Sequence, residues 1–345
     1  MKKEIPGIAA VRAIAALLIV NYHTKRLHIP VLGLLATGGF ILNIIFVGLS
    51  GYLLMIRYQH QKIDRSWYQK RLLRIYPSYW LSLIIILTIT IIFDLSKAID
   101  ISDFLVSLTG FQYFFNITTF GEQLWFVTLI LVCYISFDLT RNLVLKYRYG
   151  FILFLFSFFL ALALIRSNPG SGTNLSLNYG DLYLRISAAP LLRLTFHYLV
   201  FAMGMFVAYH VQFSEESKDR KNLFWVMISL LSFVGYFGLS RVANTALHNF
   251  LVIFLALICS YAFIMGIAGL IRSAESTLNR LLNFIASISY EIYLIHFIFV
   301  TLFQKYLPGR FTAYLLVFAL SLISAYLIKT ISSRLSKPFT RFYSL

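Results

Sequence analysis

The sequence predicts an all-α fold: a polytopic membrane bundle of about ten transmembrane helices with both termini in the cytoplasm. The 345-residue chain is 59% hydrophobic and only 12% charged, about half the charged fraction of a soluble domain. Apolar stretches recur at about the 20-residue length that crosses a bilayer. No linker or composition shift divides the chain, so we expect one integral-membrane domain over residues 1–345.

Ten apolar stretches of roughly spanning length follow one another along the chain. The segment 101–117 is a weaker candidate, because Asp100, Asp103 and Asn116 disfavour a full span; an eleventh span, a re-entrant segment and an interfacial segment all remain open. No small-residue cleavage site ends the first stretch, so we expect it to persist as a helix of the mature protein. The ten stretches lie near 7–24, 35–56, 76–93, 121–140, 150–166, 194–212, 223–240, 249–271, 285–306 and 314–331.

Basic residues orient these spans. With the amino terminus inside, 20 of the 30 lysines and arginines lie on the cytoplasmic side, nine lie opposite, and Arg12 lies within a span. The positive-inside rule therefore places both termini in the cytoplasm. The longest outside loop, 166–193, is either a surface for an extracytoplasmic substrate or an ordinary solvated connector.

Composition also excludes several classes of protein. The net charge of +17 comes from basic residues spread over many short loops, a distribution that bilayer orientation explains better than nucleic-acid binding. We therefore expect no nucleic-acid partner. Cys133 and Cys259 each lie in an apolar run and read as buried thiols, so no disulfide framework is supported. The chain also has no P-loop, dinucleotide fingerprint or metal-spaced histidine pair, and we expect no metal.

The first motif lies in the first span. Arg12 and His23 are 11 residues apart, close to three helical turns, so both project from one face about 16 Å apart along the axis. Ionisable groups inside a span are expensive and usually functional. Snorkelling of Arg12 to the interface and ordinary interfacial hydrogen bonding of His23 are the structural alternatives.

The second motif enters the third span. Arg71 and Arg74 are three residues apart and so share a helix face, with Tyr76 close behind them. Guanidinium groups match phosphate oxygens, so this pattern suits phosphate or pyrophosphate recognition. On spacing alone, positive-inside anchoring beside an aromatic belt is the more common explanation.

The remaining motifs lie in the second, fourth and ninth spans. Small residues around Ser50 predict close helix packing. Ser289, Tyr293 and His296 follow one another at i, i+4 and i+7, which forms a polar stripe that usually lines a cavity. Glu291 points elsewhere and needs its own partner or a proton to survive burial. A further candidate segment, Glu122 to Trp125, opens the fourth span.

In chain order, these motifs resemble those of the acyltransferase 3 family of bacterial membrane proteins, which includes O-antigen and other polysaccharide O-acetyltransferases. That family carries an arginine, ten residues and a histidine in its first helix, like Arg12 and His23. Its Phe-Phe-x-Leu-Ser-Gly-Phe-like segment is similar to 45–52, its Arg-x-x-Arg-Ile-x-Pro motif to 71–77, and its Ser-Tyr-x-x-Tyr-Leu-x-His motif to 289–296. The resemblance spans nearly the whole chain.

Two departures from the family pattern matter. Many relatives have an Asp-Gly pair where this chain has Ala9 and Ala10. Many also carry a glutamate in the helix that follows the tryptophan, at the position of Ile130 here, so no acidic role can be assigned to that position. The chain is more similar to relatives that have Leu-Trp-Phe in this helix.

The resemblance implies a membrane-bound O-acyltransferase of the bacterial inner membrane. It would move an acyl group, most often acetyl, from cytoplasmic acyl-CoA (acetyl-CoA) to a hydroxyl of an extracytoplasmic or cell-envelope glycan or lipid-linked sugar. His23 would be the general base or a transient acyl carrier, aided by Arg12, with Arg71, Arg74 and Tyr76 at the donor. The alternative is a multi-pass transporter or flippase without acyl chemistry. The implied supporting residues of the pocket are Ser50, Trp125, Ser289, Glu291, Tyr293 and His296.

Overall fold

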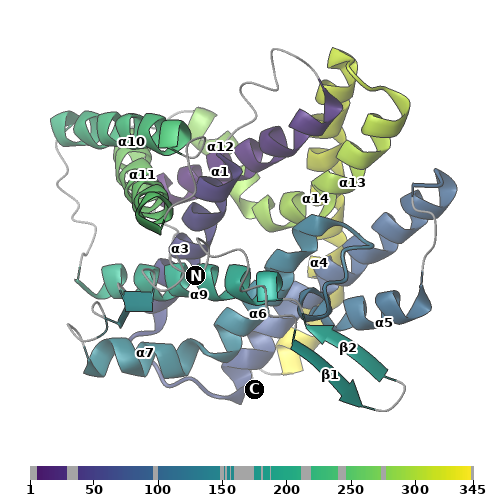
Figure 1. Ribbon diagram of the computed structural model, residues 1–345, viewed down its shortest axis with the longest axis horizontal. Helices are drawn as coiled ribbons and strands as arrows, with labels where there is room; N and C mark the ends of the chain where they lie inside the picture. Colours follow the sequence, from purple (N-terminus) through teal and green to yellow (C-terminus); the bar gives the residue numbers. More distant parts are fainter. Residues whose placement is uncertain are drawn as a thin grey trace. The chain divides into compact units, whose positions relative to one another are not determined.

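The described residues of the computed structural model are almost entirely helical (Figure 1). These residues are 6–28, 38–95, 100–147, 151, 154–155, 157–158, 175–179, 182–186, 188–210, 219–239, 246–272 and 277–342. The predicted helical class is confirmed. One exception is an antiparallel hairpin of β1 (Leu175–Tyr179) and β2 (Leu182–Ile186) inside the long loop 166–193, in which Leu175 lies opposite Ile186.

The helical elements alternate long helices with short turns of 3-10 helix. The first half contains α1 (Pro6–His23), η1 (Thr24–Leu27), α3 (Gly39–Tyr58), α4 (Arg65–Ile92), α5 (Ile101–Thr109), η2 (Gln112–Phe115), η3 (Glu122–Leu124), α6 (Trp125–Ile135) and α7 (Phe137–Lys146). The second half contains α9 (Ala188–His210), α10 (Asp219–Leu239), α11 (Ala246–Arg272), α12 (Thr277–Ser287), α13 (Ser289–Tyr306) and α14 (Phe311–Phe342).

Seven helices of the described residues are long and apolar enough to cross a membrane, and two bent pairs raise this to nine if each pair is one span. The pairs are Glu122–Ile135 with Phe137–Lys146, bent by 56°, and Thr277–Ser287 with Ser289–Tyr306, bent by 71°. Most of the predicted span 150–166 lies outside the described residues, so the count of ten and the cytoplasmic termini stay predictions. The chain is a multi-pass membrane protein.

The weak segment 101–117 is not a span. Its helix α5 has nine residues, which at about 1.5 Å per residue is less than half of the roughly 30 Å hydrocarbon core. Residues 112–115 form the separate turn η2. The prediction that polar residues disfavour a full span at 101–117 is therefore confirmed.

Helix α4 begins 11 residues before the predicted start of the third span. Asp64 is the reason, because its carboxylate accepts hydrogen bonds from the backbone N–H of Trp67 at 2.9 Å and the Ser66 hydroxyl at 2.8 Å, an N-terminal cap. These bonds hold the pKa of the exposed Asp64 carboxyl below its ordinary value. The helix then continues through Pro77, which removes one backbone donor. The Ser336 hydroxyl lies 3.4 Å from the Leu73 carbonyl oxygen that Pro77 leaves unpaired.

The chain forms two compact units, each assembled from three separated stretches. Unit 1 comprises Met1–Ala15, Gly38–Lys62 and Ser136–Asn283. Unit 2 comprises Ala16–Thr37, Ile63–Ile135 and Phe284–Leu345. Because the stretches alternate along the chain, no single sequence boundary separates the units, and the single-domain organisation stays a prediction.

In unit 1, glycines let the backbones of α3 and α9 touch. A Cβ on Gly204 would lie 2.1 Å from the Gly48 carbonyl oxygen, and a Cβ on Gly51 would lie 2.0 Å from the Phe201 carbonyl oxygen. No larger side chain fits either position without moving a helix. The predicted packing role of the small residues around Ser50 is therefore confirmed.

In unit 2, α4, α13 and α14 pack against one another, and η1 and η3 pack against α13. Side chains of α4 also donate hydrogen bonds to the last carbonyl groups of α5. Tyr79 Oη, Trp80 Nε1 and Tyr76 Oη donate to the carbonyl oxygens of Ser107 (2.6 Å), Leu108 (2.9 Å) and Thr109 (2.6 Å), respectively. The last carbonyls of a helix have no partner within it, and in a bilayer each unpaired group costs several kcal/mol. The aromatic cluster of α4 thus anchors the end of the short helix α5.

Two serines donate hydrogen bonds to backbone carbonyl groups at the bend between α12 and α13. The hydroxyl of Ser287 donates to the Phe284 carbonyl oxygen at 2.6 Å, and that of Ser289 donates to the Ala286 carbonyl oxygen at 2.9 Å. A break in a helix frees backbone groups that water cannot reach inside a membrane. Ser289 therefore helps to form the bend that begins α13.

Candidate functional site

Unit 2 contains two histidines in contact. His23 is the last residue of α1, and His296 is fully buried in the middle of α13. Nε2 of His296 lies 3.0 Å from Nδ1 of His23, which is hydrogen-bond distance. Each Nδ1 also faces a carbonyl oxygen one turn back on its own helix, Ile19 at 3.1 Å and Ile292 at 3.0 Å. The first and last sequence motifs therefore meet, although 273 residues separate them.

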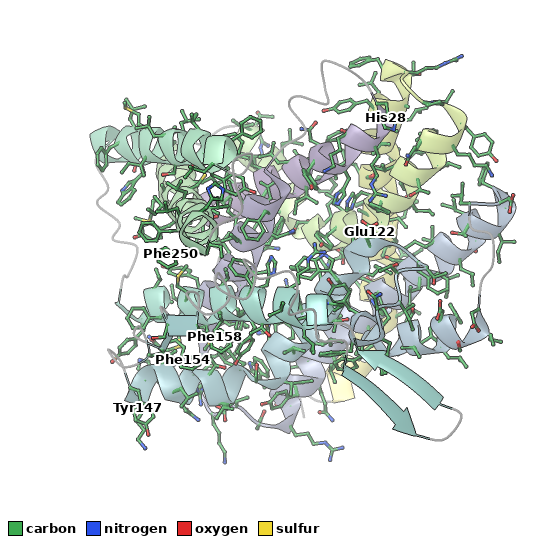
Figure 2. The ribbon with its side chains drawn as sticks, in the orientation of Figure 1. His28, Glu122, Tyr147, Phe154, Phe158 and Phe250 are labelled. Carbon is green, nitrogen blue, oxygen red and sulfur yellow. The ribbon has the colours of Figure 1, made fainter. Side chains whose placement is uncertain are left out.

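An ion pair flanks the histidines. Arg26 of η1 bonds Glu122 of η3 at 2.8 Å (Glu122 is labelled in Figure 2). The same guanidinium lies 4.7 Å from the centroid of the Phe297 ring, whose edge-to-face contact with His23 measures 5.3 Å between centroids. Arg26 was not among the predicted site residues. Its place three residues after His23, one turn along a helix, was the available signal.

The residues of the polar stripe on α13 have two different roles. The Tyr293 ring lies 5.9 Å from the His296 ring and 4.6 Å from the Phe126 ring, so it lines the histidine pair. Trp125 is buried beside Phe126, with ring centroids 6.1 Å apart. Ser289 instead bonds backbone at the bend. The structure therefore brings Tyr293 to the histidines and leaves Ser289 in a structural role.

Glu291 has the partner that its burial requires. Its side chain is completely buried, and Oε1 accepts a hydrogen bond from the Ser78 hydroxyl at 2.8 Å. Lys329 of α14 lies 3.4 Å from the same oxygen. Among the described residues, Oε2 has no hydrogen-bond partner. The carboxylate thus links α4, α13 and α14, and the expectation that Glu291 needs its own partner is confirmed.

The two arginines of α4 differ in environment, contrary to the shared face that their spacing predicts. Arg71 is only 9% exposed, and its guanidinium lies 5.2 Å from the Trp67 ring and 5.8 Å from the Tyr134 ring. Arg74 is exposed, as is Lys70, four residues earlier. Three residues are about 300° of helical rotation, enough here to put one arginine on the packed side and the other outside. Lys70 is a basic residue that the motif does not include.

Three other predicted residues fall elsewhere. The Tyr76 hydroxyl is engaged by the Thr109 carbonyl, as described above. Arg12 is half-buried in the first part of α1, and that part belongs to unit 1. Ser50 is half-buried on α3, also in unit 1. The structure keeps Arg12 and His23 on one continuous helix, 11 residues apart as predicted.

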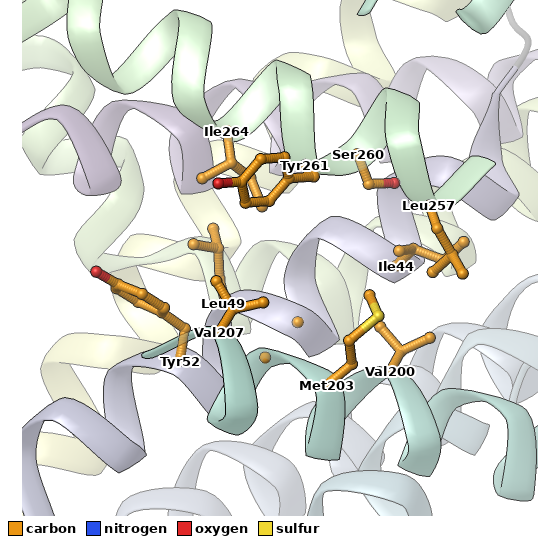
Figure 3. Close-up of a pocket in the computed structure, with 12 residues that line it drawn as sticks. Ile44, Leu49, Tyr52, Val200, Met203, Val207, Leu257, Ser260, Tyr261 and Ile264 are labelled. Carbon is orange, nitrogen blue, oxygen red and sulfur yellow. The ribbon is translucent and has the colours of Figure 1, made fainter. Parts of the chain in front are cut away.

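Unit 1 contains an apolar recess between α3, α9 and α11 (Figure 3). Its hydroxyl groups come from Tyr52, Ser260 and Tyr261, and the Ser260 hydroxyl donates to the Ala256 carbonyl oxygen at 2.7 Å. Among the residues that the structure describes, no histidine, carboxylate or guanidinium lines this recess. Its lining residues are Ile44, Gly48, Leu49, Tyr52, Val200, Met203, Gly204, Val207, Leu257, Ser260, Tyr261 and Ile264.

Within the described ranges, no three histidine, cysteine or acidic side chains gather as a metal site would require. Cys133 and Cys259 are both buried, as their apolar surroundings predict.

Together these features define a class: a multi-pass membrane protein with two imidazoles in contact, one of them fully buried, flanked by an ion pair. A family model described as an acyltransferase domain, Acyl_transf_3, matches residues 5–330. The chain therefore belongs to the acyltransferase 3 family and is a membrane acyltransferase, as its motifs predict. No curated protein matches the chain, and no solved structure does.

Proposed function

We propose that the protein transfers an acyl group, acetyl in the first instance, from cytoplasmic acyl-CoA to a hydroxyl of an extracytoplasmic or cell-envelope glycan, at the bacterial inner membrane. The observation that carries this proposal is the 3.0 Å contact between His23 and His296 in a chain of the acyltransferase 3 family. A histidine held by a second polar group is the usual arrangement for a general base.

The proposed reaction conserves atoms and charge. The acceptor oxygen attacks the thioester carbonyl carbon, a C–O bond forms and the C–S bond breaks. His23 takes the hydroxyl proton and returns it to the departing sulfur, which leaves as the free thiol. Imidazole suits this exchange because its ordinary pKa lies near neutrality. Arg12 is proposed to stabilise charge along the same helix.

Arg71 and Arg74 are proposed to serve the acyl-CoA phosphates. The exposure of Arg74 supports direct contact with phosphate oxygens, and Lys70 adds a second exposed cation one turn away. The stacking of Arg71 between Trp67 and Tyr134 supports a role in fixing this end of α4. Tyr76 supports the donor site by anchoring α5, and Ser50, Trp125, Ser289, Glu291 and Tyr293 are proposed as supporting residues.

The test is acyl transfer by the purified protein in nanodiscs with labelled acetyl-CoA and cell-envelope glycan. His23→Ala should lower kcat by about 10² to 10⁴-fold, the usual contribution of general acid–base catalysis. His28→Asn is the matched control, because His28 is exposed and in the left-handed region at φ 55°, which asparagine tolerates. Full transfer by His23→Ala at normal membrane levels would refute the assignment.

Two further measurements separate the remaining alternatives. An acyl-carrier role for His23 predicts an acylated His23 peptide after acid quenching with acetyl-CoA alone, whereas a general base leaves no such peptide. Movement of an unmodified sugar with no acetyl-CoA consumed would identify a flippase instead. A fusion-reporter map that places residues 57–74 outside would overturn the proposed cytoplasmic donor side and the cytoplasmic termini.

A further inference from the structure

We infer that His296 is a positioning residue that fixes the tautomer of His23, so that Nε2 of His23 is the atom that reacts. This inference rests on the proposed function, because it names the reactive atom of the proposed base. It comes from three hydrogen-bond contacts of the two imidazoles in unit 2.

The Ile292 carbonyl sets the tautomer of His296. A carbonyl oxygen only accepts hydrogen bonds, so Nδ1 of His296, 3.0 Å away, must carry a hydrogen. A neutral imidazole carries one N–H, so Nε2 of His296 then presents a lone pair. That lone pair faces Nδ1 of His23 at 3.0 Å.

The lone pair of His296 in turn sets the tautomer of His23. Nδ1 of His23 faces two acceptors, Nε2 of His296 and the Ile19 carbonyl oxygen at 3.1 Å, so it carries the hydrogen. Nε2 of His23 is then left with its lone pair. The opposite arrangement needs a doubly protonated, fully buried His296 and turns a lone pair of His23 toward the Ile19 oxygen. Both features are unfavourable.

His296 is held firmly enough to act this way. Its side chain has no exposed surface, and the Tyr293 and Phe297 rings lie 5.9 and 6.4 Å from it between centroids. The Gln123 amide donates to the Leu294 carbonyl oxygen at 3.1 Å, which attaches α13 to η3. A single buried rotamer keeps the acceptor atom in one place.

The same hydrogen bonds also stabilise the imidazolium form of His23 that the reaction creates. When Nε2 of His23 takes the proton of the acceptor hydroxyl, the ring becomes an imidazolium whose Nδ1–H already points at two acceptors. Hydrogen bonds to charged groups are about twice as strong as neutral ones. The contacts that set the tautomer therefore strengthen as the proton arrives, and the proton then leaves to the thiolate.

The experiment replaces the acceptor atom of His296. His296→Gln keeps a carbonyl oxygen that can accept from His23 Nδ1–H, whereas His296→Leu keeps the bulk without any acceptor. We expect His296→Leu to lower kcat by about 10²-fold or more with little change in the KM for acetyl-CoA, and His296→Gln to stay within about tenfold of the parent protein. His197→Leu is the matched control, because His197 is another buried histidine whose Nδ1 meets a carbonyl oxygen one turn back, Arg193 at 2.8 Å.

The tautomer itself is measured by ¹⁵N NMR of histidine-labelled protein in nanodiscs, with the His23 signal assigned by its loss in His23→Ala. The parent protein should show His23 protonated at Nδ1, and His296→Leu should shift that population toward Nε2. If His296→Leu does not fold, the parent spectrum decides: a His23 ring protonated at Nε2 would overturn the inference. Inactive His23→Ala with fully active His296→Leu would also overturn it, while leaving the proposed function standing.

Discussion

The two units of the molecule use opposite kinds of residue to hold helices together. Unit 1 joins α3 and α9 through glycines, whose missing side chains bring two backbones into contact. Unit 2 joins α4, α13 and α14 through a buried carboxylate, serine hydroxyls and a lysine. Close packing of helices needs no polar group, whereas polar groups in a membrane need partners. The contact between His23 and His296 lies in unit 2, among the helices that polar groups join.

The largest expected effect is a break in the glycine contact of unit 1. Gly204→Leu places a side chain where a Cβ alone would lie 2.1 Å from the Gly48 carbonyl oxygen. Because that atom is backbone, we expect a loss of stability above the 1–3 kcal/mol that is usual for overpacking. Thermal unfolding in detergent measures it, with Gly238→Ala as the control, since nothing lies within 4 Å of a Cβ on Gly238. Normal stability would show that the α3–α9 contact is loose.

The second effect tests the contacts of Glu291 with Ser78 and Lys329 in unit 2. Glu291→Ala removes the partner of Ser78 and of Lys329, whose side chain is 38% exposed. Breaking a fully buried ion pair costs about 3–5 kcal/mol. Because Lys329 can reach solvent, we expect a smaller loss, about 1–3 kcal/mol. Glu291→Gln is the matched variant, since its amide oxygen still accepts from Ser78, and it should lose less. Equal losses would contradict the assigned hydrogen bond.

The third effect separates the two arginines of α4. Arg74→Ala should raise the KM for acetyl-CoA by roughly tenfold, the equivalent of one charge-assisted hydrogen bond of about 1.5 kcal/mol, and the increase should shrink in high salt. Arg71→Ala should mainly lower thermal stability, because its guanidinium packs on two rings. Steady-state kinetics at two ionic strengths, with unfolding curves, measure both. The reverse pattern would move the donor contact to Arg71.

The smallest effect concerns the anchored end of α5. Tyr76→Phe removes one hydroxyl that bonds the Thr109 carbonyl and leaves the ring in place. We expect a loss of about 1 kcal/mol, the usual contribution of one hydrogen bond. Tyr147→Phe, at an exposed position outside this cluster, is the control. A rise in the KM for acetyl-CoA without any loss of stability would instead indicate that Tyr76 contacts the donor.

Much of this fold was predictable, because hydropathy and helical spacing are local properties of the chain. His23 and His296 were each predicted by spacing within one helix, but their mutual contact joins residues 273 positions apart. No local pattern encodes such a contact. Arg26 and the early start of α4 at Arg65 were missed for different reasons: the first depends on Glu122 in another segment, and the second on a cap at Asp64.

The spacing rule failed at Arg71 and Arg74 for a physical reason. Two residues at i and i+3 point about 60° apart around the helix axis. On an exposed helix this angle has little effect, but on a helix that packs on one side it can leave one residue buried and the other exposed. The aromatic residues after Arg74 also fit an interfacial belt by sequence, yet Tyr76, Tyr79 and Trp80 donate hydrogen bonds to the carbonyls of α5. Which carbonyls lack a partner depends on where α5 ends in space.

The bend before α13 has an electrostatic consequence. Because the helix restarts at Ser289, Glu291 lies in its first turn, where the aligned peptide dipoles present roughly half a positive charge. An unbroken helix from Thr277 to Tyr306 would place this carboxylate in mid-helix, without that field. The break in the helix therefore helps to stabilise the buried Glu291 carboxylate, in addition to the contact with Lys329. Straightening the helix would remove the stabilisation that comes from the helix dipole.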